Sequence, residues 1–441
     1  MFGLLLNLVY LGLAVIATPV VLWQRFRSGK VRRGWRQKIF GRLPFDRTNA
    51  HHEARQQVVW LHAVSVGEVL QLRQVVERLR QARPDLRLLV TTSTETGQEV
   101  ARKQLTGCDV AYFPMDFTWS VRSALRRVQP DLIVLVELEL WPNFVRIASK
   151  HGIPILLING RLSEGSHRGY AWIRPLMRQL LDRLTGIAVQ SDEYRQRFLD
   201  LGAPEDRTVV TGSIKFDGVR TDRDSPLSQE LREWAELLPE EVVLIAGSTQ
   251  DPEEEMALSV YRSLRGRHPS LRLIIVPRHP ERGNEIAAAI ERAGFFPKQR
   301  SKGEEESSIE QSDRSRKVIV PLLDTVGELG GCWALADVAF VGGSFGDRGG
   351  QNMIEPAAYG AAVCFGPNTS NFKQTVEMLL SRDAARRVDS EQEWIAFVDQ
   401  MLSHPEQARE MGERARALVL EQQGATDRTI TWILECLLRA G

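Results

Sequence analysis

The alternation of short apolar runs with amphipathic stretches, which begins at Val58, constrains the fold of this chain more than any other feature. Apolar runs of strand length lie at residues 58–61, 86–91, 131–136, 153–158, 186–190 and 208–211. Helical patterns separate them, for example at 119–128 and 193–201. Because strands that alternate with helices form parallel sheets covered on both faces, the first half is predicted to be an α/β domain.

A second series of the same kind begins with the apolar run 242–246, after a polar stretch that has the composition of a linker. Further strands are expected at 271–276, 317–320, 338–341 and 362–365, and the end of the chain has a helical pattern. We therefore predict two Rossmann-like domains that face a central cleft, where ligands commonly bind. The expected bounds are 46–220 for the first domain, 221–238 for the linker, 239–404 for the second domain and 405–441 for terminal helices that pack across both.

The N-terminal segment differs from the rest, because residues 2–23 contain no charged side chain. At about 1.5 Å rise per residue, a helix of this length can cross a bilayer. Residues 24–45 hold eight Lys or Arg and no acidic residue, which by the positive-inside rule places them in the cytoplasm. We predict a membrane anchor at 1–23 and a basic juxtamembrane segment at 24–45. Whether the anchor spans the bilayer or lies in its interface stays open, since Pro19 can kink a helix.

Composition and motifs argue against several function classes. The formal net charge of +1 gives no basic field for nucleic acid, and the four cysteines are scattered, without metal-ligand spacing. The chain has no G-x-x-x-x-G-K-[ST] loop, and no G-x-G-x-x-G motif opens either half, which argues against a P-loop NTPase and against NAD binding. The acidic triplet Asp222-Arg223-Asp224 lies in the expected linker rather than at a strand end. We therefore expect no nucleic-acid partner, no metal and no cofactor.

Glu68 stands at the start of a helical pattern that directly follows the apolar run 58–61. Ligands of open α/β sheets bind at the carboxyl ends of strands, next to helix N-termini. A carboxylate at this place can accept a proton from a substrate hydroxyl. It can equally do no more than complement the helix dipole in the first turn. This segment alone supports both interpretations of Glu68.

Other polar residues follow the expected strands of the first half. Glu137 and Glu139 come directly after one strand, and two carboxylates at i and i+2 of a strand point the same way. Arg161 lies in the polar segment 159–163 after the next strand. Lys215 closes the half, where it can stabilise negative charge on a departing phosphate or be a solvated lysine of the linker. We expect at least one of the glutamates to lie in a site.

Several strand ends of the second half carry residues suited to a nucleotide. They are the polar stretches at 247–249, 277–280, 324–329 and 342–344, and a further polar motif follows at 352–356. Arginine, present at Arg278, suits a phosphate or a planar base. The first backbone N–H groups of a helix bind oxyanions. Together these stretches predict a nucleotide pocket in the second half.

Three motifs in this order resemble the 3-deoxy-D-manno-octulosonic acid (Kdo) transferases of lipopolysaccharide biosynthesis, which are glycosyltransferases of the GT-B fold. The motifs are His62-Ala63-Val64-Ser65-Val66-Gly67-Glu68, Glu137-Leu138-Glu139-Leu140-Trp141-Pro142-Asn143, and Gly342-Gly343-Ser344 with Asn352-Met353-Ile354-Glu355-Pro356. The resemblance extends from the anchor to about Leu380. Leu138 departs from it, because a Thr or Ser is expected between the two glutamates. That departure leaves open which glutamate is functional, and Glu137 is preferred.

The resemblance implies an inverting transfer of Kdo from CMP-Kdo to a lipid A precursor, on the cytoplasmic face of the bacterial inner membrane. Glu68 matches the general base of the family. Glu137 and Lys215 match residues that stabilise the transition state. The implied partners are CMP-Kdo, the lipid A precursor and membrane lipids.

The resemblance also implies two sets of binding residues. The acceptor would contact Ser65, Gly67 and Arg161 in the first domain. The CMP of the donor would contact a larger set in the second domain, namely Pro277, Arg278, Gly327, Glu328, Leu329, Ser344, Asn352, Met353, Ile354 and Glu355.

Two other interpretations stay open at this point. A nucleotide-sugar 2-epimerase or a UDP-sugar transferase shares the twin-domain fold, although an epimerase needs no anchor. Competition by CMP rather than UDP would separate Kdo transfer from both. A membrane-tethered sugar- or lipid-binding protein without catalysis would bind its ligand unchanged after Glu68→Gln.

Overall fold

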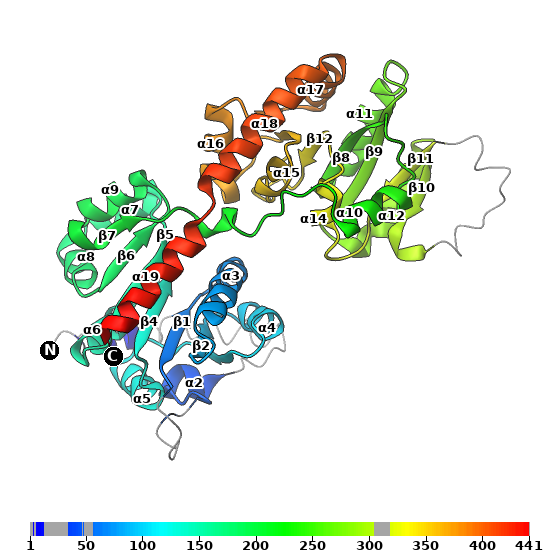
Figure 1. Ribbon diagram of the computed structural model, residues 1–441. Helices are drawn as coiled ribbons and strands as arrows, with labels where there is room; N and C mark the ends of the chain where they lie inside the picture. Colours follow the sequence, from blue (N-terminus) through cyan, green and yellow to red (C-terminus); the bar gives the residue numbers. More distant parts are fainter. Residues whose placement is uncertain are drawn as a thin grey trace. The chain divides into compact units, whose positions relative to one another are not determined.

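The computed structural model describes residues 3, 6–12, 34–45, 47, 56–303 and 318–440. The chain divides into two compact units, the first formed by Met1–Gly218 with Gln422–Gly441 and the second by Val219–Glu421. Each unit is built on a seven-stranded sheet that carries helices (Figure 1). The sequence-based prediction of two parallel α/β domains is confirmed.

The sheet of the first unit has the strand order β3-β2-β1-β4-β5-β6-β7, and its strands pair in parallel. Trp60 and Leu135 enter one hydrophobic core, whereas Leu61 and Val134 enter another. Because both faces are buried, the central strands are nearly continuous apolar runs in the sequence. The strands are β1 (Val58–His62), β2 (Arg87–Thr92), β3 (Asp109–Tyr112), β4 (Leu132–Val136), β5 (Ile155–Gly160), β6 (Gly186–Val189) and β7 (Thr208–Val210).

Helices cover both faces of this sheet. The core on one side contains Leu72 of α3 and Ile433 of α19, and the core on the other side contains Val121 of α5 and Phe144 of α6. The helices are α2 (Trp35–Phe40), α3 (Val66–Ala82), α4 (Glu95–Gln104), α5 (Thr118–Val128), α6 (Pro142–Lys150), α7 (Glu164–Ala171), α8 (Arg174–Leu181), α9 (Asp192–Asp200) and α19 (Ala425–Ala440), with the 3-10 turns η1 (Glu205–Arg207) and η2 (Ile214–Phe216).

The sheet of the second unit has the order β10-β11-β9-β8-β12-β13-β14, again with parallel pairs. Its strands are β8 (Val242–Thr249), β9 (Leu271–Pro277), β10 (Phe296–Gln299), β11 (Ile319–Leu322), β12 (Val338–Val341), β13 (Ala362–Phe365) and β14 (Ala385–Arg387). Its helices are α10 (Pro226–Trp234), α11 (Glu253–Leu264), α12 (Gly283–Arg292), α14 (Leu329–Trp333), α15 (Ile354–Ala358), α16 (Lys373–Ser381), α17 (Glu391–Ser403) and α18 (Pro405–Gln422), with the 3-10 turns η3 (Pro280–Arg282), η4 (Arg300–Lys302) and η6 (Ser370–Phe372).

The segment 221–238, expected to be a linker, lies within the second unit. Its helix α10 packs against α14 and buries Leu231. Arg223, which precedes this helix, donates hydrogen bonds to the carbonyl oxygens of Tyr359 and Ala336 at 2.8 and 2.9 Å. These contacts attach the polar segment 221–238 to the second unit, so it is part of that unit.

The two terminal helices belong to different units. Helix α18 buries Ala415 and Leu418 and belongs to the second unit, apart from its last residue. Helix α19 packs against α3 and β4 of the first unit. The terminal segment 405–441 thus contributes one helix to each unit.

The N-terminal segments are described only in part. Residues 34–45 of the predicted basic segment pack on the first unit, where Leu43 and Phe45 are buried in its core. Of the predicted anchor, only residues 3 and 6–12 lie within the described part. Asn7 and Tyr10 there donate hydrogen bonds to Thr118 and Asp116 at 2.8 and 2.9 Å. Among residues that the structure describes, no helix has both the length and the apolar character needed to cross a membrane.

Candidate functional site

Charged side chains gather at the carboxyl edge of the first sheet. Glu68 lies in the first turn of α3 after β1, Glu137 follows β4, Arg161 follows β5 and Lys215 lies in η2 after β7. Because the strands are parallel, these positions share one edge of the sheet. The charges of Glu68, Glu137 and Arg161 each shift the pKa of Lys215, so the four groups are electrostatic neighbours. The structure therefore brings together the three predicted catalytic residues and one predicted acceptor residue.

Glu68 is held as part of a helix cap. Ser65 is the N-cap residue of α3, and its hydroxyl accepts from the Glu68 N–H and donates to Glu68 Oε1 at 2.7 Å. Oε2 of Glu68 accepts from the Val64 N–H at 2.8 Å. This reciprocal arrangement resembles a capping box, except that Glu68 accepts from the N–H of Val64, one residue before the N-cap. Glu68 thus stabilises the N-terminus of α3. A role as general base requires that its carboxylate can also contact a substrate.

The environment of Glu68 also favours the neutral carboxyl. Glu68 is only 9% exposed. Burial raises its pKa, the hydrogen bonds from Val64 and Ser65 lower it, and the charge of Glu137 raises it. A raised pKa brings a carboxylate closer to the range in which it can accept and release a proton near neutral pH. Gly67, also predicted to contact the acceptor, is exposed beside it in the first turn.

The geometry of Glu137 and Glu139 differs from the prediction. Strand β4 ends at Val136, and Glu137 lies in a turn with a φ of 59°. The rule that residues i and i+2 of a strand point the same way therefore does not apply to this pair. Burial raises the pKa of Glu139 to about 7, and the charge of Glu68 adds to the shift. Both glutamates thus lie within electrostatic reach of Glu68.

Lys215 is half-buried among these charges. Burial lowers its pKa and Arg161 lowers it further, whereas Glu137 and Glu68 raise it. The ammonium group lies within electrostatic reach of two carboxylates and offsets part of their charge at a partly desolvated edge of the sheet. Lys215 is therefore part of the candidate site and not a solvated linker residue.

The predicted donor residues of the second unit lie at or near the carboxyl ends of its strands. Arg278 is exposed directly after β9, which ends at Pro277. Glu328 accepts from Arg300 at 2.9 Å and also from the Thr325 hydroxyl. The exposed Gly327 has a left-handed φ of 94°, and Leu329 begins α14.

The motif at 352–356 forms a second part of this edge. Asn352 donates to Glu355 Oε1 at 2.9 Å, and its own Oδ1 accepts from the Ile354 N–H at 3.1 Å. Burial raises the pKa of Glu355. Met353 and Ile354 are buried, so their side chains support the motif from beneath.

Ser344 is fully buried, and its hydrogen-bonding groups face the protein. Its hydroxyl donates to the Val341 carbonyl and accepts from the Gly366 N–H, both at 2.8 Å. The turn that it closes already holds an anion of the protein itself. The Glu253 carboxylate accepts from the N–H groups of Gly343, Ser344 and Phe345 at 2.7, 2.8 and 3.0 Å. Ser344 thus has a structural role in this turn, and its contact with the donor stays a prediction.

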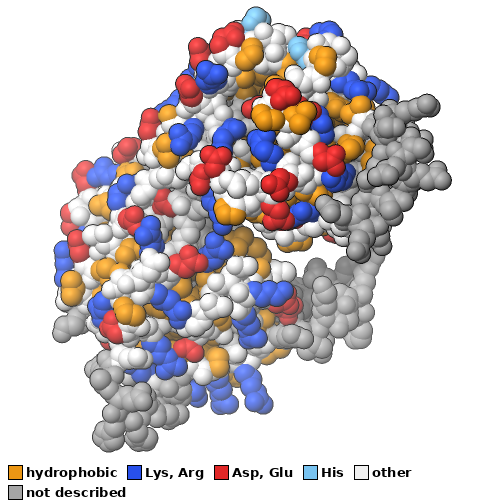
Figure 2. All heavy atoms as spheres, turned by 45° about the vertical axis from the view of Figure 1, so that its right-hand side comes forward, with side chains coloured by type: hydrophobic (Ala, Val, Ile, Leu, Met, Phe, Trp, Pro, Cys, Tyr) orange, Lys and Arg blue, Asp and Glu red, His pale blue; other side chains and the backbone are white. Residues whose placement is uncertain are grey.

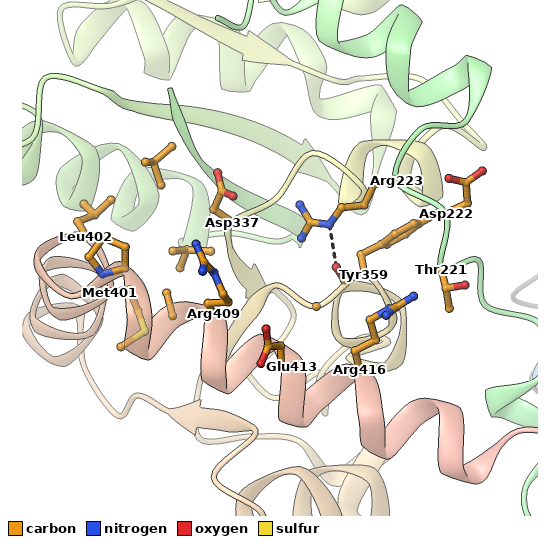
Figure 3. Close-up of a pocket in the computed structure, with 15 residues that line it drawn as sticks. Thr221, Asp222, Arg223, Asp337, Tyr359, Met401, Leu402, Arg409, Glu413 and Arg416 are labelled. Atoms are coloured by element: carbon orange, nitrogen blue, oxygen red, sulfur yellow. Dashed lines mark hydrogen bonds between the residues drawn. The ribbon is translucent and has the colours of Figure 1, made fainter. Parts of the chain in front are cut away.

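A cavity of about 800 Å³ also lies in the second unit (Figure 3). Val242 and Val338, the first residues of β8 and β12, line it together with Arg223, Tyr359 and Arg416. It is therefore at the amino edge of the sheet, opposite the predicted donor residues. Figure 3 shows the Arg223 guanidinium directed at the Tyr359 carbonyl, to which it donates a hydrogen bond.

Two residues that make hydrogen bonds near these sites were not predicted as site residues. Glu253 is not among the predicted site residues, yet its carboxylate fills the glycine turn after β12. Asn159 is fully buried with a φ of 54° at the end of β5. In the described part of the chain, no three His, Cys, Asp or Glu side chains are grouped so that they could hold a metal ion.

A family model and several curated relatives share one description. Residues 33–218 match the family model described as 3-deoxy-D-manno-octulosonic-acid transferase (kdotransferase). A 3-deoxy-D-manno-octulosonic acid transferase of Bordetella pertussis is 33% identical over 433 residues, which cover 95% of this chain and 96% of that protein.

Solved structures with similar folds are more distant in sequence. A glycosyltransferase of Rickettsia africae is 13% identical with a TM-score of 0.54, over 88% of this chain and 99% of that one. A UDP-GlcNAc 2-epimerase of Neisseria meningitidis, solved with UDP-GlcNAc, is 14% identical with a TM-score of 0.56, over 87% of this chain and all of that one. At this identity the likeness shows the fold alone, which is that of two parallel-sheet α/β domains as in GT-B glycosyltransferases.

Proposed function

The chain belongs to the 3-deoxy-D-manno-octulosonic acid transferase family, and from that premise we propose that it moves Kdo from CMP-Kdo to a lipid A precursor. It is a glycosyltransferase that transfers Kdo in lipopolysaccharide biosynthesis. The observation that carries the proposed mechanism is the cluster of Glu68, Glu137 and Lys215 at the carboxyl edge of the first sheet.

Glu68 is the general base in this proposal. Its carboxylate takes the proton of an acceptor hydroxyl, the hydroxyl oxygen bonds to the anomeric carbon of Kdo, and the bond from that carbon to CMP breaks. CMP leaves with the electron pair, and the configuration at the anomeric carbon inverts. The acceptor hydroxyl replaces the Ser65 hydroxyl as the partner of Glu68 Oε1, while the Val64 N–H keeps Oε2 in place.

Lys215 and Glu137 stabilise the transition state. The Lys215 ammonium group stabilises the negative charge that develops on the departing phosphate. This stabilisation is strengthened because the site is partly desolvated. Glu137 in turn raises the pKa of Lys215 and so keeps its ammonium group charged. Gly67 and Arg161 contact the acceptor at the same edge. This first unit therefore supplies the chemistry and the acceptor site.

The second unit binds the CMP of the donor, without a metal or other cofactor. Arg278 is exposed and suits the phosphate. Asn352 and Glu355 form a hydrogen-bonded pair that can receive ribose hydroxyls. Gly327, Glu328 and Leu329 offer a backbone turn before α14, with Glu328 fixed by Arg300. Met353, Ile354 and Ser344 hold these groups from within the unit.

A surface on α2 and α5 supports a location on the cytoplasmic face of the inner membrane, with residues 1–23 as the anchor. Trp35, Phe40 and Trp119 expose 43%, 53% and 42% of their surface. Exposed arginines accompany them, namely Arg36, Arg42, Arg122 and Arg126. In Figure 2, Lys and Arg side chains gather at the lower end of the first unit, where Figure 1 places α2 and α5. Aromatic and basic groups together suit an anionic lipid surface, and sedimentation with anionic vesicles tests this. Protein that stays in the supernatant contradicts it.

The test of the reaction is product formation. The protein is incubated with CMP-Kdo made in situ and a lipid A precursor, and the acceptor is examined by mass spectrometry for added Kdo. We expect a mass increase of one or more Kdo residues and inhibition by CMP rather than UDP. Inhibition by UDP alone, or conversion of a UDP-sugar into its epimer without transfer, would replace the proposal with another activity of the same fold.

A further inference from the structure

Asn159 makes an unusual set of contacts for a residue at the end of a strand. It is fully buried and adopts a left-handed backbone with a φ of 54°. Its carbonyl oxygen accepts from Gln190 Nε2 at 3.0 Å, which joins β5 to the end of β6. Asparagine is one of the few residues other than glycine that enter this conformation readily. The side chain is then directed by two further hydrogen bonds.

These two bonds use both ends of the Asn159 amide. Oδ1 accepts from the backbone N–H of Ile214 at 3.2 Å. Because an N–H can only donate, this bond assigns Oδ1 and leaves Nδ2 directed at Gln71, where it donates to Oε1 at 2.6 Å. Ile214 directly precedes Lys215 in η2. Gln71 lies three residues after Glu68 on α3, and thus on the same side of the helix.

We propose that Asn159 is a positioning residue that fixes the backbone of Lys215 and the helix of Glu68 relative to each other. The inference rests on the proposed function, since it gives these two groups their roles. The buried Asn159 amide joins α3, which carries the proposed base, to η2, which carries the cation. Neither α3 nor η2 is a strand, so no sheet hydrogen bonds connect them. Ile214 also shares a hydrophobic core with Leu72 of α3, and the Asn159 amide adds the directional contacts that orient η2 and its Lys215 with respect to this helix.

Asparagine is required here for its chemistry as well as its shape. Aspartate keeps the acceptor for Ile214 but loses the donor for Gln71, and it adds a negative charge next to Lys215. Leucine or alanine loses both bonds and leaves the Ile214 N–H buried without a partner. A misplacement of about 1 Å in a catalytic group can cost on the order of 100-fold in rate.

The test compares Asn159→Ala with wild type and with Thr185→Val in the full-length protein. Thr185 Oγ1 accepts from the Ile155 N–H at 3.1 Å, at the opposite end of β5, so its loss is a matched control for removing a side-chain acceptor. We expect Asn159→Ala to lower kcat by roughly 10- to 100-fold with KM for CMP-Kdo within about twofold. Thr185→Val should keep kcat. Equal kcat in Asn159→Ala and wild type would overturn the proposal.

A pH profile separates positioning from general damage. The charged groups around Glu68 are Glu137, Glu139 and Lys215, with Arg161 beside Lys215. When Lys215 is no longer held in place, its cation stabilises the Glu68 carboxylate less. The acid limb of the kcat profile then moves to higher pH. An unshifted limb together with lowered kcat would mean that Asn159 acts only on stability.

A second variant and a second readout cover the case in which Asn159→Ala fails to fold. Gln71→Met breaks only the bond to α3, at a half-buried position, and should shift the limb in the same direction with a smaller loss of kcat. Amide hydrogen exchange at Ile214 should accelerate in Asn159→Ala and stay unchanged in Thr185→Val. If wild-type protein transfers no Kdo, the proposed function fails, and exchange at Ile214 still decides whether Asn159 fixes η2.

Discussion

Glu139 links the candidate site to the stability of the first unit. Its pKa is raised to about 7, above the ordinary value of 4.5, by burial and by the charge of Glu68. The folded state therefore holds this proton more tightly than the unfolded chain does. The resulting stabilisation is complete below pH 4.5 and is lost as the pH rises through about 7.

Glu139→Gln should remove this pH dependence, because the amide is neutral at every pH. We expect the variant to be more stable than wild type at pH 8 by on the order of 1 kcal/mol, a value reduced for solvent screening, and nearly equal at pH 5. The check is the free energy of unfolding of the first unit, from the denaturant dependence of amide exchange in β4. A variant that is less stable than wild type at pH 8 would contradict the raised pKa.

The Ser65 hydroxyl should lower the pKa of Glu68, the proposed general base. Ser65→Ala removes a donor to Glu68 Oε1, which stabilises the ionised carboxylate, so the pKa of Glu68 rises further. A general base acts only when it is deprotonated, and the acid limb of the kcat/KM profile should therefore move to higher pH. Ser163→Ala, which removes the N-cap of α7, is the matched control and should leave the limb in place. Identical limbs in Ser65→Ala and wild type would count against Glu68 as the base.

At the scale of single elements, Glu253 holds the glycine turn after β12. Its buried carboxylate accepts from Gly343, Ser344 and Phe345, and also from the Gln250 N–H at 2.9 Å. Glu253→Gln should destabilise the second unit by about 2–3 kcal/mol, because it replaces charge-assisted acceptors of buried N–H groups with one neutral amide. The measurement is chemical denaturation of the full chain, followed by amide exchange in β12.

Glu255→Gln is the control for Glu253→Gln. Glu255 lies on the same helix and is exposed, with its carboxylate 3.6 Å from Arg292. Its substitution should change stability by no more than about 0.5 kcal/mol. Similar losses in the two variants would show that the turn does not depend on Glu253.

The central strands could be predicted from the sequence, whereas three edge strands could not. β3, β10 and β14 lie at sheet edges, where burial is incomplete and apolar runs are short. β3 begins with Asp109, β10 contains Lys298, and β14 ends with two arginines. Because they are short and carry charged residues, these strands lack the continuous apolar run that identifies a parallel strand.

The sequence allowed the residues of the candidate site to be predicted, but not the backbone conformation that holds them. Glu68 and Lys215 follow strand patterns, and their shared edge follows from parallel order. The left-handed turn at Glu137 has no sequence signal, since glycine does not mark it. The capping bonds of Glu68 were foreseeable from Ser65 three residues earlier. The role of Glu253 was not, because its partners come from a turn about 90 residues later.

At the scale of the whole molecule, the C-terminal helix completes the first unit. Ile433 of α19 is fully buried in the core that contains Leu72 of α3. The sequence showed a helical end but not which unit it packs on, because the contact joins residues more than 300 positions apart. Amphipathic patterning gives the buried face of a helix and not its partner.

Ile433→Ala should therefore destabilise the first unit by about 2–5 kcal/mol and leave the second unchanged. Leu438→Ala, on the same helix at a position 75% exposed, should have little effect. Amide exchange resolved by unit measures both. Loss of stability in the second unit alone would contradict the packing of α19 on α3.

The role of Glu68 as general base is tested by measuring Kdo transfer from CMP-Kdo made in situ to a lipid A precursor, by wild type and by Glu68→Gln. Glu77→Gln, on the exposed side of the same helix, is the matched control. We predict transfer by wild type and by Glu77→Gln, and a loss of roughly 100-fold or more in Glu68→Gln with CMP binding retained. Undiminished transfer by Glu68→Gln would contradict it, and would leave Glu68 as a helix cap and direct the search for the base to Glu137 and Glu139.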